Sequence, residues 1–76
     1  MTPSERRVIK EDIRAFIRCL LNNGFKASSI ARAANLRRTH AVINNSIGYA
    51  KGIVLINTYS NNWALWKEKG KCVKTQ

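Results

Sequence analysis

The chain is a strongly basic polypeptide of 76 residues, with 14 Lys and Arg residues against 4 Asp and Glu residues and a formal net charge of +10. This length allows one domain with a thin core, and a hydrophobic share of 45% excludes wholesale disorder. No apolar run approaches the roughly 18 residues that a membrane-spanning helix needs, and the N-terminus lacks a signal-peptide core. We therefore expect a cytoplasmic protein with no membrane partner.

The first predicted element is a helix that begins at Thr2-Pro3-Ser4-Glu5, which carries a capping residue, a proline suited to the first helical position and a capping-box glutamate. Asn23-Gly24 supplies the stop. Apolar residues recur between these signals at helical spacing: Ile9, Ile13, Phe16, Ile17, Leu20 and Leu21. Basic residues occupy the other faces, either as a solvated surface or as auxiliary phosphate contacts: Arg6, Arg7, Lys10, Arg14 and Arg18.

Two further helices are predicted next. The second spans about 27–34 and buries Ile30, Ala31 and Ala34. Asn35 is expected to cap the third helix, which runs to about Ala50 with Lys51-Gly52 closing it. Several residues of this third helix are poor helix formers, which leaves open an earlier end near Asn45: Asn44, Asn45, Ser46 and Gly48.

A β-hairpin is predicted to follow the third helix. The run from Ile53 to Tyr59 is rich in β-branched and aromatic residues, as is the shorter run from Trp63 to Trp66, and Ser60-Asn61-Asn62 between them favours a turn. In a strand the two tryptophans would face opposite sides. The domain is expected to span 1–69, followed by a frayed basic tail at 70–76.

The order of these elements resembles the winged helix-turn-helix family of bacterial and phage DNA-binding regulators. The resemblance covers about Arg6 to Lys69, and its most specific stretch is SSIARAANLRRTHAVINN followed by the hairpin. It implies a mainly α fold with a small β-hairpin (α+β), in which the third helix enters the major groove and the hairpin forms the wing. The implied function is sequence-specific binding of double-stranded DNA by a small transcriptional regulator, a repressor or an activator.

The predicted DNA contacts follow from this arrangement. The resemblance places the groove contacts on Arg37, Arg38, His40, Ala41, Asn44 and Asn45, and the wing contacts on Asn61 and Asn62 with Lys67 nearby. We add Gly48, which like Ala41 lacks bulk and would let the helix approach the bases, and Lys51 at the end of the helix.

The residues themselves support these assignments. Arg37 and Arg38 would lie in the first turn of the third helix, where the helix dipole disfavours cations by up to about 1 kcal/mol unless they meet phosphates or a guanine edge. Asn44 and Asn45 are of the type that hydrogen-bonds adenine. No carboxylate occurs between Ile13 and Lys67, which favours a polyanionic partner.

Other classes of function remain open at this stage. The same charge suits non-specific DNA or RNA binding, or a phage-type inhibitor whose basic face grips a host protein. A homodimer is expected for groove reading, because one small domain contacts few base pairs. The sequence holds no nucleophile–base arrangement, and Cys19, Cys72 and His40 show no metal-ligand spacing. We therefore expect neither an enzyme nor a cofactor, and no disulfide.

Overall fold

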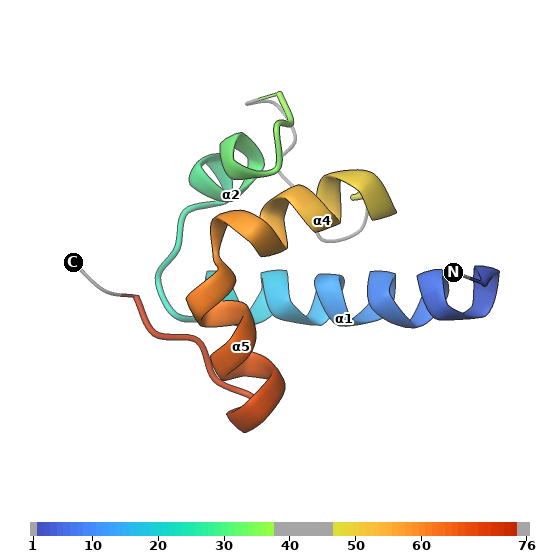
Figure 1. Cartoon of the computed structure of the whole chain (residues 1–76). Helices are drawn as coiled ribbons and strands as arrows, with labels where there is room; N and C mark the ends of the chain where they lie inside the picture. Colours follow the sequence, from blue (N-terminus) through green and yellow to red (C-terminus); the bar gives the residue numbers. More distant parts are fainter. Residues whose placement is uncertain (1, 38–46, 75–76) are drawn as a thin grey trace.

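The computed structural model describes residues 2–37 and 47–74, and these residues form helices and connecting segments without a strand (Figure 1). The helices are α1 (Pro3–Asn22), α2 (Ala27–Ala33), α4 (Tyr49–Thr58) and α5 (Ser60–Lys69). The predicted α+β winged helix-turn-helix is therefore wrong: the described part of the chain is an all-helical fold with no hairpin wing.

Helix α1 forms as its sequence predicts. Thr2 Oγ1 accepts a hydrogen bond from the Glu5 backbone N–H at 3.2 Å, and Pro3 occupies the first turn. At the other end Gly24 adopts a left-handed φ of 94°, which releases the chain from the helix. The predicted apolar stripe is confirmed, because four of its residues have no exposed surface: Ile13, Phe16, Ile17 and Leu20.

Helix α2 is also confirmed, but Asn35 ends it instead of beginning the next helix. Asn35 has a φ of 59°, and the backbone N–H of Leu36 donates to the Ala31 carbonyl at 2.7 Å. The Asn35 N–H donates to the Arg32 carbonyl at 3.0 Å, so the two bonds form a Schellman motif. A left-handed residue in this motif is incompatible with the extended backbone of an N-cap, which corrects the predicted start of the third helix.

The predicted end of the third helix is wrong as well. Ile47 is buried with 2% exposure, and Gly48 is extended, with φ −89° and ψ 177°. Helix α4 begins directly after Gly48, so Ala50 and Lys51 lie in its first turn instead of the last turn of an earlier helix. Residues 38–46, which hold the middle of the predicted third helix, lie outside the described residues.

The predicted hairpin is replaced by α4 and α5, which meet at Tyr59. The reason lies in a helical period that runs through both segments and faces the core, with intervals of three or four residues: Gly52, Leu55, Tyr59, Trp63 and Trp66. Burial of this stripe outweighs the β propensity of the single residues, since propensities are small beside tertiary packing. Trp63 and Trp66 consequently stack on one face, with centroids 5.4 Å apart.

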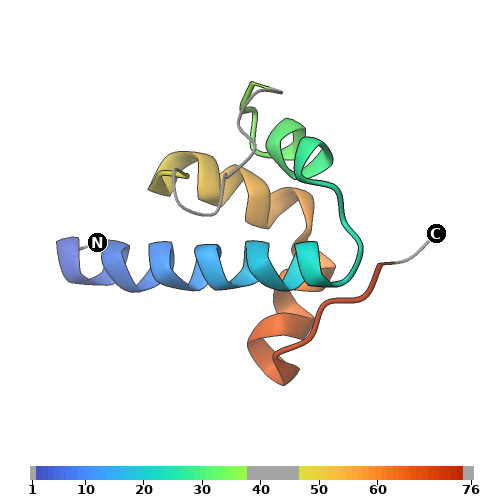
Figure 2. The same cartoon turned by 180° about the vertical axis from the view of Figure 1, so that it is seen from behind.

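Helix α4 lies at the centre of the arrangement and contacts α1, α2 and α5. It runs alongside α1, α2 packs against its other side, and α5 turns away from its C-terminal end (Figures 1 and 2). The segment that follows α5 does not fray over its described part. It returns to the core, where Cys72 is only 3% exposed.

Candidate nucleic-acid interface

Helix α1 carries opposite charges on its two long edges. At 100° per residue, Arg7, Lys10 and Arg14 fall on one edge, and Glu5 and Asp12 fall on the other. The acidic edge faces α5, where Asp12 Oδ2 accepts a hydrogen bond from Lys67 Nζ at 3.0 Å. The basic edge is thus separated from most of the negative charge of the helix.

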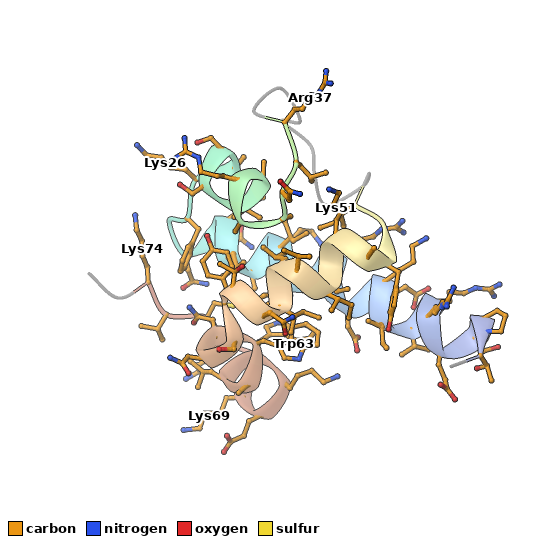
Figure 3. The ribbon with its side chains drawn as sticks, turned by 45° about the horizontal axis from the view of Figure 1, so that its top comes forward. Lys26, Arg37, Lys51, Trp63, Lys69 and Lys74 are labelled. Atoms are coloured by element: carbon orange, nitrogen blue, oxygen red, sulfur yellow. The ribbon has the colours of Figure 1, made fainter. Side chains whose placement is uncertain are left out.

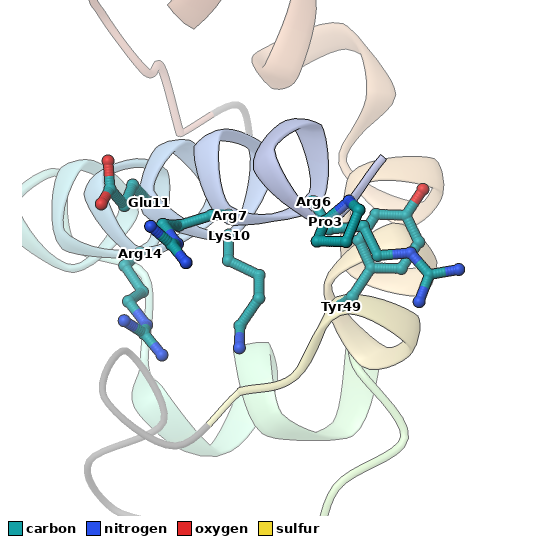
Figure 4. A pocket seen from close by; sticks show the side chains of 7 residues that line it. All are labelled: Pro3, Arg6, Arg7, Lys10, Glu11, Arg14 and Tyr49. Atoms are coloured by element: carbon teal, nitrogen blue, oxygen red, sulfur yellow. The ribbon is translucent and has the colours of Figure 1, made fainter. Parts of the chain in front are cut away.

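The basic edge lines an open cleft between α1 and the start of α4, which we call the α1–α4 cleft (Figure 4). Its volume is about 370 Å³. The lining residues are Pro3, Arg6, Arg7, Lys10, Glu11, Arg14 and Tyr49. Lys10 and Arg14 extend from α1 toward the same side, while Arg6 lies beside Tyr49 (Figure 4). Four cations therefore share the cleft with one carboxylate.

Tyr49 connects the cleft to the N-terminus of α4. The Arg6 guanidinium carbon lies 5.4 Å from the centroid of the Tyr49 ring, a cation–π contact that orders the arginine without neutralising it. Gly48 provides no side-chain cap for α4, and the first turn of this helix holds no acidic residue. The positive end of the helix dipole thus adds to the charge of the cleft.

Although Glu11 lies in the same cleft, no ion pair joins the cleft cations to a carboxylate among the described residues. The ion pair in this part of the chain is Lys67–Asp12, which lies on the other edge of α1. Arg14 is half-buried, and its Nε–H, which is shielded from solvent, lacks a hydrogen-bond partner within the described ranges. A shielded donor without a partner destabilises the fold by about 1–3 kcal/mol, so Arg14 is held in the cleft at a cost in stability.

The spacing of the basic edge suits a row of phosphates. Arg7 and Arg14 are two helical turns apart, which corresponds to roughly 10 Å along the axis. One strand of duplex DNA carries a phosphate about every 3.4 Å of the duplex axis, so the length of the edge corresponds to a few phosphates of one strand.

Most of the groove contacts predicted from the sequence lie outside the described residues: Arg38, His40, Ala41, Asn44 and Asn45. Arg37 is described and exposed, and it projects from the segment after α2 (Figure 3). Gly48 is exposed too, but as the extended residue before α4 and not as part of a recognition helix.

The remaining predicted contacts make internal interactions or lie at the α4–α5 junction. Lys51 Nζ donates to the Asn35 carbonyl at 3.0 Å, which satisfies the C-terminal end of α2. Asn62 Oδ1 accepts from the Val73 backbone N–H at 2.8 Å, and Asn61 is exposed beside it in the first turn of α5. Lys67 is held by Asp12 and lies over the Trp63 and Trp66 rings. Asn61, Asn62 and Lys67 do not gather with Arg37, because α5 turns away from α2 (Figure 1).

The cleft itself was only partly visible in the sequence. Arg7, Lys10 and Arg14 are among the basic residues that the sequence assigns to the faces outside the apolar stripe, and auxiliary phosphate contacts were one of the two interpretations of those residues. The position of Tyr49 could not be predicted, because it depends on how α4 packs against α1 and no local pattern in the sequence indicates that packing.

Several other kinds of site find no support in the described residues. These residues include no group of three or more His, Cys, Asp or Glu side chains that could hold a metal ion. Among the described helices, none combines the length and apolar character that crossing a bilayer requires. Comparisons of the chain with models of protein families, with curated proteins and with solved structures found no match.

Proposed function

We propose that the protein binds double-stranded DNA, and that the α1–α4 cleft makes the contacts to the phosphate backbone. The observation that carries the proposal is a row of cations without ion pairs among the described residues, formed by Arg7, Lys10 and Arg14 beside the uncapped start of α4. Phosphates are the anions that occur at regular spacing on a biological polymer, and arginine and the N-termini of helices both bind them.

The aromatic residues favour a duplex over a single strand. Proteins that bind single strands stack bases on exposed rings. All six aromatic side chains of this chain lie in the described ranges, and none is fully exposed. Phe16, Trp63 and Trp66 contact one another, Phe25 packs edge-on against Tyr59, and Arg6 lies over the Tyr49 ring, so each ring already has a partner within the chain.

Backbone contacts of this kind are independent of base sequence. Regulation of transcription at one site would require base contacts in addition, for which the sequence offers Arg37, Arg38, Asn44 and Asn45. Selection of bound duplexes from a random library, at stated salt, separates the two modes. One enriched motif indicates site-specific binding, and uniform retention indicates backbone binding alone.

The cleft is tested with two triple variants that lower the net charge equally. The first is Arg7→Gln/Lys10→Gln/Arg14→Gln, and the second replaces three exposed lysines away from the cleft, Lys26, Lys69 and Lys71, by Gln. Affinity for a duplex of about two helical turns is measured over a range of salt concentrations. We expect the cleft variant to bind about 30-fold more weakly and its log–log salt slope to fall by about 2.7, because three phosphate contacts are lost.

The control variant should retain its affinity within a few-fold and most of its salt slope. Equal losses in the two variants would show that binding follows net charge and not the α1–α4 cleft. Tighter binding to a single strand of the same length would contradict the duplex preference. Circular dichroism of each variant verifies that the helices remain formed.

A further inference from the structure

Cys19 and Cys72 lie together where the C-terminal end of the described chain returns to α1. Cys72 belongs to the buried core, with 3% exposure, and the half-buried Cys19 packs against the same cluster. Both are free thiols. Two cysteines distant in the chain are thus brought to one place by the fold.

The segment around Cys72 is held by hydrogen bonds to two parts of the chain, α5 and the turn that follows α1. The Val73 backbone N–H donates to Asn62 Oδ1 at 2.8 Å, and Lys74 Nζ donates to the Gly24 carbonyl at 3.1 Å. Asn23, which precedes Gly24, uses its side-chain Nδ2 to contact the Cys19 carbonyl at 2.7 Å and Cys19 Sγ at 3.6 Å. These contacts hold residues 72–74 beside the last turn of α1, where Cys19 lies.

The two thiols differ in their surroundings. Burial raises the pKa of Cys72 to about 12, and a hydrogen bond and charge interaction with the Cys19 thiol act in the same direction. Cys72 is therefore a shielded thiol that keeps its proton at neutral pH. Cys19 is the more accessible of the two, so a reagent in solution reaches it first.

We propose that Cys19 and Cys72 are a disulfide-forming site, which a low-molecular-weight disulfide such as oxidised glutathione closes. The Cys19 thiolate attacks one sulfur of the reagent, forms a mixed disulfide and releases one glutathione thiolate. Cys72 then loses its proton to solvent and attacks Cys19 Sγ, which releases the second glutathione. The protein dithiol is oxidised by two electrons, and one glutathione disulfide is reduced to two thiols.

Closure ties the C-terminal segment to α1 and stabilises the folded chain. The bond closes a loop of about 50 residues, which removes much of the conformational freedom of the unfolded state. Cys19 lies on the side of α1 that faces away from the basic edge, so the α1–α4 cleft is unaffected. This inference is therefore independent of the proposed DNA binding.

The test equilibrates the protein with mixtures of reduced and oxidised glutathione, at low protein concentration, in buffer and in concentrated guanidinium chloride. Acid-trapped samples are resolved by mass spectrometry into the dithiol, the glutathione adduct and the internal disulfide, which is lighter by two hydrogens. We expect the internal disulfide to dominate in buffer, with an effective concentration of the two thiols at least about 10-fold higher than in denaturant. The Tm of the oxidised chain should exceed that of the reduced chain by about 10 °C.

Two variants identify the order of events. In Cys19→Ser the remaining Cys72 should stay unmodified while the chain is folded, and in Cys72→Ser the glutathione adduct on Cys19 should persist. The comparison of folded and unfolded wild-type protein depends on neither variant, so it stands if one of them fails to fold. An effective concentration no higher in buffer than in denaturant, a lasting adduct on the wild-type chain, or covalent dimers in place of the internal bond would each overturn the proposal.

Discussion

Gly52 of α4 lies directly against the side chain of Ile13 on α1. A Cβ atom at Gly52 would overlap Ile13 Cδ1 and stand 3.3 Å from both Cγ1 and Cγ2 of the same side chain. Ile13 has no exposed surface and thus little room to move. The absence of a side chain at Gly52 is what allows α4 to approach α1, and this approach places Tyr49 beside the basic edge of α1.

Replacing Gly52 with Ala should destabilise the fold, although alanine is the better helix former. The gain in helix propensity is about 1 kcal/mol, whereas overpacking a core contact costs about 1–3 kcal/mol. We expect the free energy of unfolding to fall by about 1 kcal/mol, as measured by urea denaturation followed by circular dichroism. Gly48→Ala adds the same methyl group where no described atom lies within 4 Å of a Cβ, so it carries no overpacking cost and loses only the preference of an N-cap for glycine over alanine. A stabilised Gly52→Ala chain would show that the two helices are not in close contact at this point.

Replacing Lys67 with Gln tests whether this residue, which the sequence predicts as a DNA contact of the wing, contributes to DNA binding. Lys67 Nζ is occupied by Asp12 at 3.0 Å on the α5 side of α1, so this lysine should contribute little to DNA binding. We expect the affinity for duplex DNA to change by less than about twofold. The free energy of unfolding should fall by less than about 1 kcal/mol, since exposed ion pairs are weak. Lys10→Gln removes the same charge from the cleft and should weaken binding by about threefold or more. Similar losses for the two variants would restore Lys67 as a DNA contact.

Replacing Trp63 with Ala should detach α5 from the core. No residue of α5 is fully buried, and the helix is held by the edge-on contact of Trp63 with Phe16, 5.1 Å between centroids, and by the stacked Trp66. We expect a loss of about 3 kcal/mol in unfolding free energy, with Trp63→Phe losing about 1 kcal/mol. Hydrogen exchange should show faster exchange of α5 amides than of α1 amides in the alanine variant. A loss below about 1 kcal/mol would mean that α5 has another anchor.

The stability of the reduced chain should fall at alkaline pH because of Cys72. Burial raises the pKa of this thiol from its ordinary value of 9.0 to about 12, so the unfolded chain releases the proton first. The stabilisation is complete below about pH 9 and is lost as the pH rises toward 12, with a slope of up to about 1.4 kcal/mol per pH unit. Denaturant unfolding under reducing conditions measures this slope. Burial also raises the pKa of Tyr59 above its ordinary 10.0, with the same sign, but this group is present in the control as well.

Cys72→Ala is the control for this effect. Its absolute stability differs because a core atom is removed, but its stability should depend less steeply on pH between 9 and 12. Parallel curves for the two proteins would show that Cys72 ionises as an exposed thiol does.

Local signals in the sequence were sufficient for α1 and α2. The Thr2 cap, the apolar stripe and the left-handed Gly24 all act within a few residues of the chain, and each is found in the structure. The sequence predicts Asn35 as the cap of the third helix, which is wrong. The left-handed conformation of Asn35 ends α2, because the Schellman bonds use carbonyls that precede it.

The α4–α5 region was predicted incorrectly because two patterns coexist there. Ile53, Val54 and Ile56 favour a strand as single residues, whereas the four-residue spacing of Leu55, Tyr59 and Trp63 favours a helix. The helix is the more stable alternative because its apolar residues can be buried against Ile13 and Phe16 of α1. Contacts so distant in the chain leave no local trace. The same limit applies to the α1–α4 cleft, whose cations were identifiable but whose Tyr49 wall was not.

The opposite edges of α1 have a consequence for how the protein meets its partner. Arg7 and Arg14 on one side and Glu5 on the other give helix α1 an asymmetry of charge, in addition to the net charge of +10 of the protein. Near a polyanion this asymmetry favours approach with the basic edge of α1 toward the strand before the two surfaces touch. Encounters are therefore pre-oriented, and added salt should slow the association rate by screening that attraction.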